Sequence, residues 1–135
     1  MTSTRHKGRY LIDTHVFLWA LDSVERLSQR SREILDDRSS EILLSRTSYW
    51  EICLRISKGK LRLKPGWERT LERERKRNRF HWLEISSQHC ESLISLPEIH
   101  RDPFDRMLIS QATCEGVVLV SCNELMSQHE VEVLW

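Results

Sequence analysis

Short apolar runs alternate with helical patterns along this chain, and that alternation restricts the fold more than any other feature of the sequence. Each apolar run is short enough for one buried strand, and the runs lie at residues 10–12, 41–44, 81–85, 117–120 and 131–134. Helical patterns separate them, at residues 28–37, 47–57, 67–77, 87–96 and 103–115. Strands separated by helices favour a mainly parallel sheet with helices on both faces, so we predict an α/β fold.

The clearest helical pattern lies at residues 47–57. Its apolar residues follow the i, i+3, i+4, i+7 spacing of one buried face: Tyr49, Ile52, Cys53 and Ile56. Glu51 lies on the opposite side of this helix. Because Glu51 precedes Arg55 by four residues, a weak surface ion pair is one interpretation and a functional carboxylate is the other.

The composition of the chain fits one folded domain, with 135 residues of which 39% are hydrophobic and 30% are charged. It begins without an apolar stretch of signal-peptide length, and no apolar run approaches the roughly 20 residues of a membrane span, so we expect a cytoplasmic protein. The four cysteines form no CxxC pair, and we expect them to be reduced and mostly buried. The sequence lacks the common nucleotide-binding, serine-hydrolase and HExxH motifs.

The net charge of +1 conceals a strong separation of charge along the chain. Residues 55–79 contain 11 basic and 3 acidic side chains, whereas residues 80–135 contain 2 and 9. A basic segment followed by an acidic one indicates a surface for a polyanion beside a region that could hold a cation. A solvated helix face is the alternative, because most charge runs are of that kind.

Three aspartates occupy informative positions. Asp13 directly follows the first predicted strand, and ligands of parallel sheets bind beyond the carboxyl ends of the strands. Capping is the alternative, because Asp13 or Thr14 could begin the next helix. Asp102, Pro103 and Asp105 resemble a helix start, with Asp102 as the N-cap. Capping explains Asp105 less well, so Asp105 is the better functional candidate.

Carboxylates gathered in one crevice repel each other at neutral pH, so such a cluster normally holds a hard divalent cation such as Mg²⁺ or Mn²⁺. The cation could orient and deprotonate a water and stabilise charge on a phosphodiester. Pattern alone does not place Asp13, Glu51 and Asp105 together, so their proximity is a hypothesis.

Four segments, followed by the terminal VEVLW, stand out by their order and spacing: YLIDTHVFLWAL, SYWEICLRISKGKLRL, HRDPFDRMLISQA and VVLVSCNELM. Together they resemble PIN-domain proteins of the VapC type, the toxins of VapBC toxin-antitoxin pairs. We therefore expect an N-terminal extension at residues 1–9 and a PIN domain at residues 10–135. The resemblance implies a three-layer α/β fold with a central, mainly parallel sheet, and an endoribonuclease that requires Mg²⁺ (or Mn²⁺).

The resemblance also assigns the catalytic site, with Asp13 and Asp105 as metal ligands and Glu51 as the helix acid. The chain departs from the family at the fourth position, where Asn123 stands two residues after Ser121 in place of the usual Asp. An amide oxygen lacks the charge of a carboxylate, which weakens cation binding. Further candidate members of the site are Asp102, Ser121 and Thr14.

In this context the basic segment would contact RNA phosphates, first through Arg55, Lys58 and Lys60, with salt-sensitive affinity and no sequence choice. Trp67 and Trp82 could stack on unpaired bases, although core packing is the commoner role. The resemblance further implies a cognate antitoxin whose tail occupies the acidic groove, and a homodimer of the chain.

Two rival functions remain open. Because Asn123 departs from the family pattern, the chain could be a catalytically weakened PIN homologue that binds RNA or a protein without cleaving it. A DNA or structure-specific nuclease is the other rival, because metal-assisted hydrolysis does not itself select the sugar.

Overall fold

The computed structural model describes residues 8–99 and 101–135, and these residues build a sheet of five parallel strands. The strands are β1 (Arg9–Ile12), β2 (Glu41–Ser45), β3 (Phe80–Leu83), β4 (Val118–Val120) and β5 (Val133–Leu134). Their order is β3-β2-β1-β4-β5, so β1 is central and pairs with β2 on one side and β4 on the other. The topological switch point therefore lies at the carboxyl ends of β1 and β4, where sheets of this kind bind ligands.

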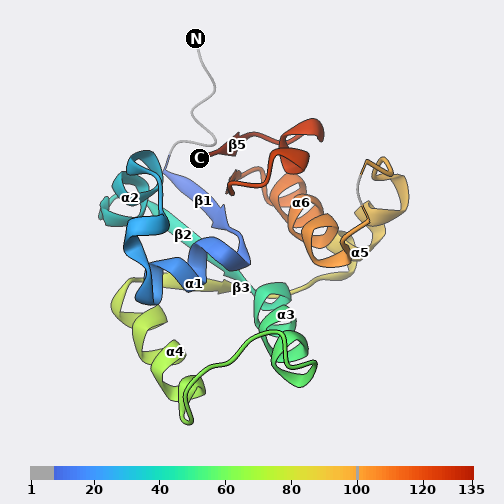
Figure 1. Cartoon of the computed structure of the whole chain (residues 1–135). Coiled ribbons are helices and arrows are strands. Elements are labelled where there is room, and N and C mark those ends of the chain that lie inside the picture. Colours follow the sequence, from blue (N-terminus) through green and yellow to red (C-terminus); the bar gives the residue numbers. More distant parts are fainter. Residues whose placement is uncertain (1–7, 100) are drawn as a thin grey trace.

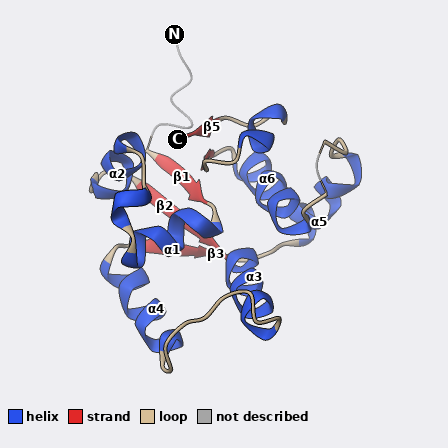
Figure 2. Ribbon diagram, in the orientation of Figure 1, coloured by secondary structure: helices blue, strands red, loops and turns tan. Residues whose placement is uncertain are grey.

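Helices cover both faces of this sheet (Figures 1 and 2). They are α1 (Thr14–Asp22), α2 (Gln29–Asp36), α3 (Arg46–Ser57), α4 (Trp67–Arg77), α5 (Ser87–Ser92) and α6 (Pro103–Glu115), with 3-10 turns η1 (Val24–Arg26), η2 (Leu93–Ser95) and η3 (Glu124–Gln128). The three-layer α/β prediction is confirmed. Each helix of the described residues is too short or too polar to cross a lipid bilayer.

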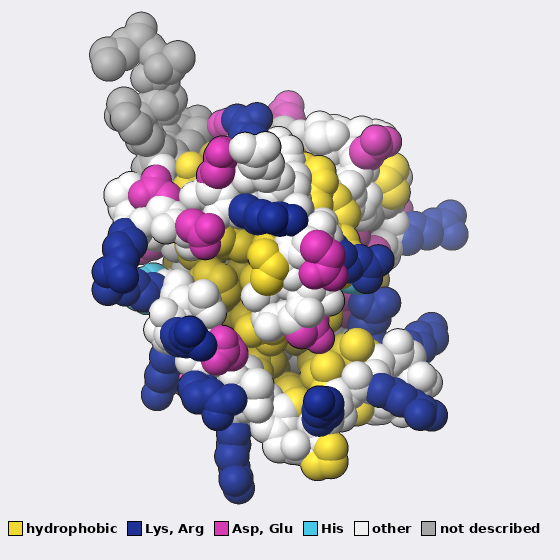
Figure 3. Space-filling model, turned by 60° about the vertical axis from the view of Figure 1, so that its left-hand side comes forward, with side chains coloured by type: hydrophobic (Ala, Val, Ile, Leu, Met, Phe, Trp, Pro, Cys, Tyr) yellow, Lys and Arg dark blue, Asp and Glu magenta, His cyan; other side chains and the backbone are white. Residues whose placement is uncertain are grey.

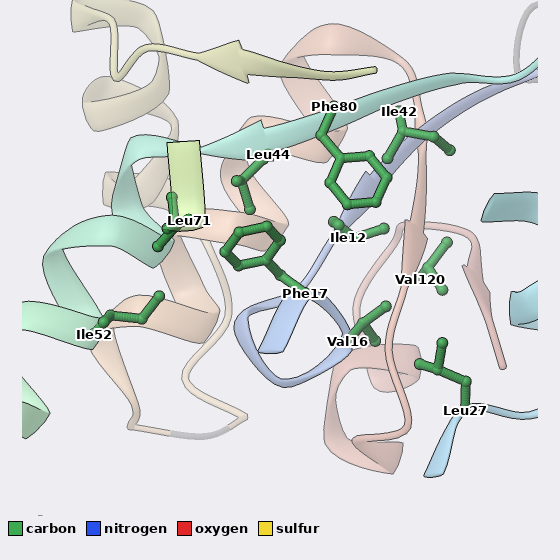
Figure 4. Close-up of a cluster of buried hydrophobic side chains, with 10 residues drawn as sticks. All are labelled: Ile12, Val16, Phe17, Leu27, Ile42, Leu44, Ile52, Leu71, Phe80 and Val120. Atoms are coloured by element: carbon green, nitrogen blue, oxygen red, sulfur yellow. The ribbon is translucent and has the colours of Figure 1, made fainter. Parts of the chain in front are cut away.

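Strand alternation divides the core into two layers. Ile12, Leu44 and Val120 point toward α1, α2 and α4, in a cluster shown in Figure 4. The neighbouring residues Leu11 and Leu43 point to the opposite face, where they meet α6 and η3. Successive strand residues face opposite sides of a sheet, so short apolar runs without polar gaps fit a sheet buried on both faces. Burial of each such side chain contributes about 1.5–3 kcal/mol.

Most boundaries agree with the sequence patterns, and the differences are local. α4 and α6 span the predicted residues, and α6 ends at Gly116, whose φ of 66° suits glycine. The predicted strand at 81–85 instead spans Phe80–Leu83, and only Val133–Leu134 of residues 131–134 joins the sheet. The predicted helix at 87–96 tightens into η2 after Ser92.

The expectation that the cysteines are mostly buried is wrong. Cys53, Cys90 and Cys122 are exposed, and Cys114 is half-buried. Cys53 is exposed because the buried side of α3 differs from the predicted apolar stripe. The buried residues of α3 are Thr47, Ser48, Glu51 and Ile52. α3 contacts α1 and α6, so polar residues, rather than the outer part of the apolar stripe, occupy its inner side.

Candidate active site

Asp13 lies at the switch point, directly after β1, and is 5% exposed. Its Oδ1 accepts a hydrogen bond from the Val16 backbone N–H at 2.8 Å, so Asp13 also caps α1. The Ser121 side chain hydrogen-bonds to the same carboxylate from the end of β4. Burial raises the pKa of Asp13, and the hydrogen bonds from Ser121 and Val16 oppose that rise. The capping interpretation of Asp13 is therefore confirmed, and its position after β1 leaves the functional interpretation a prediction.

Glu51 reaches the same region from α3 and is 8% exposed. Its Oε1 accepts a hydrogen bond from the Thr14 hydroxyl at 2.7 Å, and Thr14 Oγ1 also lies 2.9 Å from Ser48 Oγ. Thr14 thus fixes Glu51 instead of capping α1. Burial raises the pKa of Glu51, the Thr14 hydrogen bond lowers it, and the nearby Asp102 raises it further.

Arg55 supplies a cation at the edge of this region. Its Nη1 lies 3.8 Å from Glu51 Oε2 and 3.2 Å from His15 Nε2. A guanidinium only donates hydrogen bonds, so His15 Nε2 accepts and the ring proton of a neutral His15 is on Nδ1. The i, i+4 ion pair expected from the sequence is present, but its carboxylate is buried.

α6 contributes Asp102 and Asp105 from its first turn. Asp102 is the N-cap: its Oδ1 accepts from the backbone N–H groups of Phe104 at 2.9 Å and Asp105 at 3.2 Å. Burial raises the pKa of Asp105 to about 7, and the charges of Asp102, Asp13 and Glu51 add to the rise. The structure therefore brings together four carboxylates that we call the acidic cluster: Asp13, Glu51, Asp102 and Asp105.

Asn123, at the start of η3, faces the acidic cluster with its amide nitrogen. Its Nδ2 donates to Asp105 Oδ2 at 3.1 Å, and its Oδ1 accepts from the Leu125 backbone N–H at 3.0 Å. The reverse orientation would place oxygen against a carboxylate and NH₂ against an N–H, so both contacts fix the amide. The sequence suggested that the Asn123 carbonyl oxygen could face a metal, but this oxygen accepts a hydrogen bond from the backbone instead. The amide nitrogen faces Asp105, and its hydrogen bond favours the ionised form of that carboxylate.

The acidic cluster fits a hydrated divalent cation. Burial and then repulsion by the neighbouring carboxylates raise the pKa of Asp105, and a cation would relieve the repulsion. Within the described part of the chain, no three His, Cys, Asp or Glu residues lie close enough to enclose a metal ion by themselves. Mg²⁺ commonly keeps several waters and uses one or two carboxylates with substrate phosphates, so Asp13 and Asp105 fit that arrangement.

A buried hydrogen-bond network, missed by the sequence analysis, connects the elements that support the acidic cluster. The Ser45 hydroxyl donates to Gln111 Oε1 at 2.5 Å, and Gln111 Nε2 lies 3.3 Å from His89 Nδ1. His89 Nε2 lies 2.9 Å from Glu115 Oε2. Gln111 therefore ties α6 to the end of β2, where α3 begins. A glutamine on the apolar face of the helix at 103–115 was the available signal.

The basic residues divide into two groups. On α4, Glu72 accepts from Arg75 at 2.7 Å, and Glu74 lies 3.8 Å from both Arg73 and Arg77. The Arg75 hydrogen bond lowers the pKa of Glu72 to about 2. All charged residues of the segment between α3 and α4 are basic, and they make no ion pair with any described residue: Lys58, Lys60, Arg62 and Lys64.

Figure 3, turned so that the α1, α2 and α4 side of Figure 1 comes forward, shows Lys and Arg side chains projecting over the lower half of this face. The solvated-face interpretation thus suits α4, whose charges pair within the helix. For residues 58–64, which we call the basic loop, the polyanion interpretation stays a prediction.

Trp67 and Trp82 pack into the protein. Both contact Tyr49, with ring centroids 5.8 Å apart, and both border the core cluster of α1, α2 and α4. Arg46 also stacks over Trp82, with its guanidinium carbon 3.9 Å from the ring centroid. The core-packing interpretation of these two tryptophans is confirmed.

Comparisons place this geometry among known folds. The sequence model of the PIN domain matches residues 10–131. The VapBC2 complex of Rickettsia felis bound to a promoter DNA fragment has a TM-score of 0.74 at 17% identity, over 94% of this chain and 98% of that chain. DNA-bound VapBC of Salmonella typhimurium has 0.65 at 19% (93% and 96%), and VapBC-1 of nontypeable Haemophilus influenzae has 0.62 at 15% (93% and 96%). No curated protein matches the sequence significantly.

Proposed function

The chain belongs to the PIN domain family, and we propose on that premise that it is a metal-dependent endoribonuclease, the toxin of a toxin-antitoxin pair. PIN domains are nucleases, and they generally use divalent metal ions. The observation that best supports the proposal is the convergence of Asp13, Glu51 and Asp105 from β1, α3 and α6 at the switch point of the sheet. Burial raises the pKa of each of these carboxylates, and neighbouring carboxylates raise the pKa of Glu51 and Asp105 further, a combination that is common at functional sites.

Each residue of the site has a proposed role. Asp13 and Asp105 would hold Mg²⁺ or Mn²⁺, which supplies an acidified water and neutralises charge on the scissile phosphate. Glu51, held by the Thr14 hydroxyl, orients the attacking water and accepts its proton. Asn123 Nδ2 orients Asp105 and opposes the rise of its pKa. Ser121 does the same for Asp13, and Asp102 fixes the first turn of α6.

The basic loop is the proposed phosphate-binding surface. Lys58 and Lys60 are exposed directly after α3, the helix that contains Glu51. Arg55 is nearer the acidic cluster, where its contact with Glu51 leaves it partly compensated. Phosphate contacts of this kind give affinity that decreases with salt and does not depend on base sequence.

A cognate antitoxin and a homodimer complete the proposal. Several proteins of the same fold were solved as VapBC complexes. The acidic cluster would attract a basic side chain of an antitoxin, which would compete with the cation for the same carboxylates.

The test is cleavage of a mixed RNA pool and of DNA of matched sequence by purified protein with Mg²⁺ or Mn²⁺. We expect RNA cleavage that EDTA and Asp105→Asn both abolish, whereas Asp36→Asn, at an exposed site on α2, leaves it unchanged. Equal cleavage of DNA would favour the structure-specific nuclease. An inert wild type that still binds RNA would favour the weakened homologue.

A further inference from the structure

Trp50 is an exposed aromatic residue beside the acidic cluster. The residue is 54% exposed, whereas Trp67 and Trp82 pack against the core. Trp50 stands outside the stripe formed by Tyr49, Ile52, Cys53 and Ile56, so its exposure agrees with the helical pattern of α3. Much of the indole surface is therefore available to a ligand, and an aromatic ring offers a large contact area to one.

The Trp50 indole has a defined orientation. Its ring packs against Phe104 with centroids 4.8 Å apart and an interplanar angle of 72°, an edge-to-face contact. Phe104 is itself half-buried in the first turn of α6. The indole is thus braced while much of its surface remains open, which reduces the entropy lost when a ligand stacks on it.

This aromatic pair joins the two helices that supply the acidic cluster. Trp50 precedes Glu51 on α3, and Phe104 lies between Asp102 and Asp105 on α6. A nucleotide whose phosphate is held at the acidic cluster would therefore have the indole within reach of its own base or the next one.

An RNA base fits this position better than a protein partner does. A stable interface buries about 800 Å² on each partner, far more than one indole offers. The other large exposed apolar residues of the described chain lie outside α3 and α6: Val24, Ile85, Ile94, Leu125 and Trp135. The surrounding carboxylates disfavour a phosphate on the ring, but a neutral base has no such penalty.

We propose that Trp50, braced by Phe104, is a stacking platform for one unpaired base of the RNA beside the cleaved phosphodiester. This inference rests on the proposed nuclease function and adds a substrate-positioning residue to it. Stacking on an aromatic side chain accepts any base, because every base has a π face. The platform therefore selects single-stranded RNA over duplex, without selecting a sequence.

The test pairs a protein change with a substrate change. Binding of a short single-stranded RNA is measured in Mg²⁺ in a Glu51→Gln background, which keeps Asp13 and Asp105 for the cation but removes the proposed proton acceptor. Trp50 is either retained or replaced by Ala in that background. The RNA is then replaced by a series in which each position in turn is abasic. We expect one abasic position to weaken binding about 10-fold where Trp50 is retained, and Trp50→Ala to weaken binding of the intact RNA equally. Trp50→Ala should show no further loss with that abasic RNA.

Matched variants separate stacking from folding and from assembly. Trp50→Phe retains a ring and should restore part of the affinity, whereas Ile94→Ala, at an 87% exposed site on η2, should leave it unchanged. Duplex RNA of the same sequence should bind wild type and Trp50→Ala equally. Circular dichroism should show the same fold for every variant.

The inference and the proposed function can fail separately. If wild type cleaves RNA with Mg²⁺ but Trp50→Ala matches it in KM and in its response to abasic RNA, the platform is wrong and the nuclease stands. If wild type cleaves nothing but binds RNA with the Trp50-dependent abasic effect, the platform stands and the nuclease is wrong. If Trp50→Ala only converts a dimer to a monomer in sedimentation, Trp50 is a protein contact and the inference is overturned.

Discussion

Two carboxylates of this protein have pKa values moved in opposite directions. Burial and three neighbouring carboxylates raise the pKa of Asp105 in the acidic cluster to about 7. On α4, hydrogen bonds from Arg75 lower the pKa of Glu72 to about 2. The acidic cluster therefore disfavours the ionised form of its carboxylate, whereas α4 favours the ionised form by pairing it within one helix. Strongly shifted pKa values of the first kind are common at functional sites.

The acidic cluster and the basic segment also differ in whether one residue can replace another. In the acidic cluster, Thr14 holds Glu51, Ser121 holds Asp13 and Asn123 holds Asp105. Most basic side chains of residues 55–79 are exposed and repeat along the chain, so one can replace another. Single substitutions should therefore have large effects in the acidic cluster and small ones in the basic segment.

The largest expected effect is the loss of cleavage in Asp13→Asn. The change is isosteric and retains an oxygen for the Val16 cap, so the fold should persist while a charged metal ligand is lost. Replacing a residue that only supports a metal ligand typically lowers metal affinity or activity about 10- to 100-fold. Because Asp13 is a proposed ligand itself, we expect kcat/KM to fall by more than about 100-fold. Initial rates on an RNA oligonucleotide measure it.

Glu72→Gln on α4 is the matched control for Asp13→Asn. It also replaces a carboxylate by an amide, but at a paired, partly exposed position. Its rate should stay within about 2-fold of wild type, because ion pairs of this kind contribute little. A comparable loss in both variants would remove the distinction between the two regions.

Asn123→Asp should strengthen cation binding. The present amide donates to Asp105, whereas a carboxylate there would add a negative charge and two oxygens beside it. We expect the Mg²⁺ concentration for half-maximal cleavage to fall about 10-fold, as for one added favourable charge contact of about 1.4 kcal/mol. Asn78→Asp, at the exposed end of α4, should leave that concentration unchanged. An unchanged value in Asn123→Asp would mean that position 123 does not affect the cation.

The sequence predicted the positions of the site better than its contacts. Parallel topology and the end of a strand located Asp13, and the helix-start pattern located Asp102 and Asp105. The burial of Glu51 was not predictable, because it depends on α3 meeting α1 and α6, elements distant in sequence. The orientation of the Asn123 amide depends on Asp105, 18 residues away, so no local pattern contains it.

Dependence on contacts between distant elements also explains which residues were predicted wrongly from the sequence. The helical stripe on α3 included Cys53, which is exposed. The spacing of apolar residues predicts which side of a helix is apolar, but it does not predict which elements pack against that side. Trp50 lay outside that stripe, and this was a usable signal of exposure. Its contact with Phe104 on α6 required the folded chain.

The metal-free protein should lose stability as pH rises from about 4 to about 7. Folded Asp105 keeps its proton to about pH 7, whereas the unfolded chain releases it near 3.8. The folded state therefore binds more protons across this window, and raising the pH favours unfolding. Asp13 and Glu51 contribute with the same sign. After a discount for solvent screening, we expect about 1–2 kcal/mol from Asp105.

Thermal unfolding in EDTA and in Mg²⁺ at several pH values measures this effect. Mg²⁺ should raise the Tm more above pH 7 than near pH 5, because protonated Asp105 does not bind it. Asp105→Asn should flatten the metal-free profile between pH 4 and 7, while Asp36→Asn should not. A wild-type Tm that rises through this window would contradict the raised pKa values.

The smallest expected effect concerns the basic residues themselves. In Lys58→Gln/Lys60→Gln we expect binding of single-stranded RNA to weaken a few-fold at low salt, with the slope of log affinity against log salt reduced by roughly 0.7 for each phosphate that the variant no longer binds. Arg73→Gln/Arg77→Gln also removes two charges, but from residues beside Glu74, so both affinity and slope should change less. Equal losses in the two double variants would show that RNA follows the whole basic segment. A weakening confined to the Lys58 and Lys60 variant would show that ion pairing within α4 removes that helix from the RNA-binding surface.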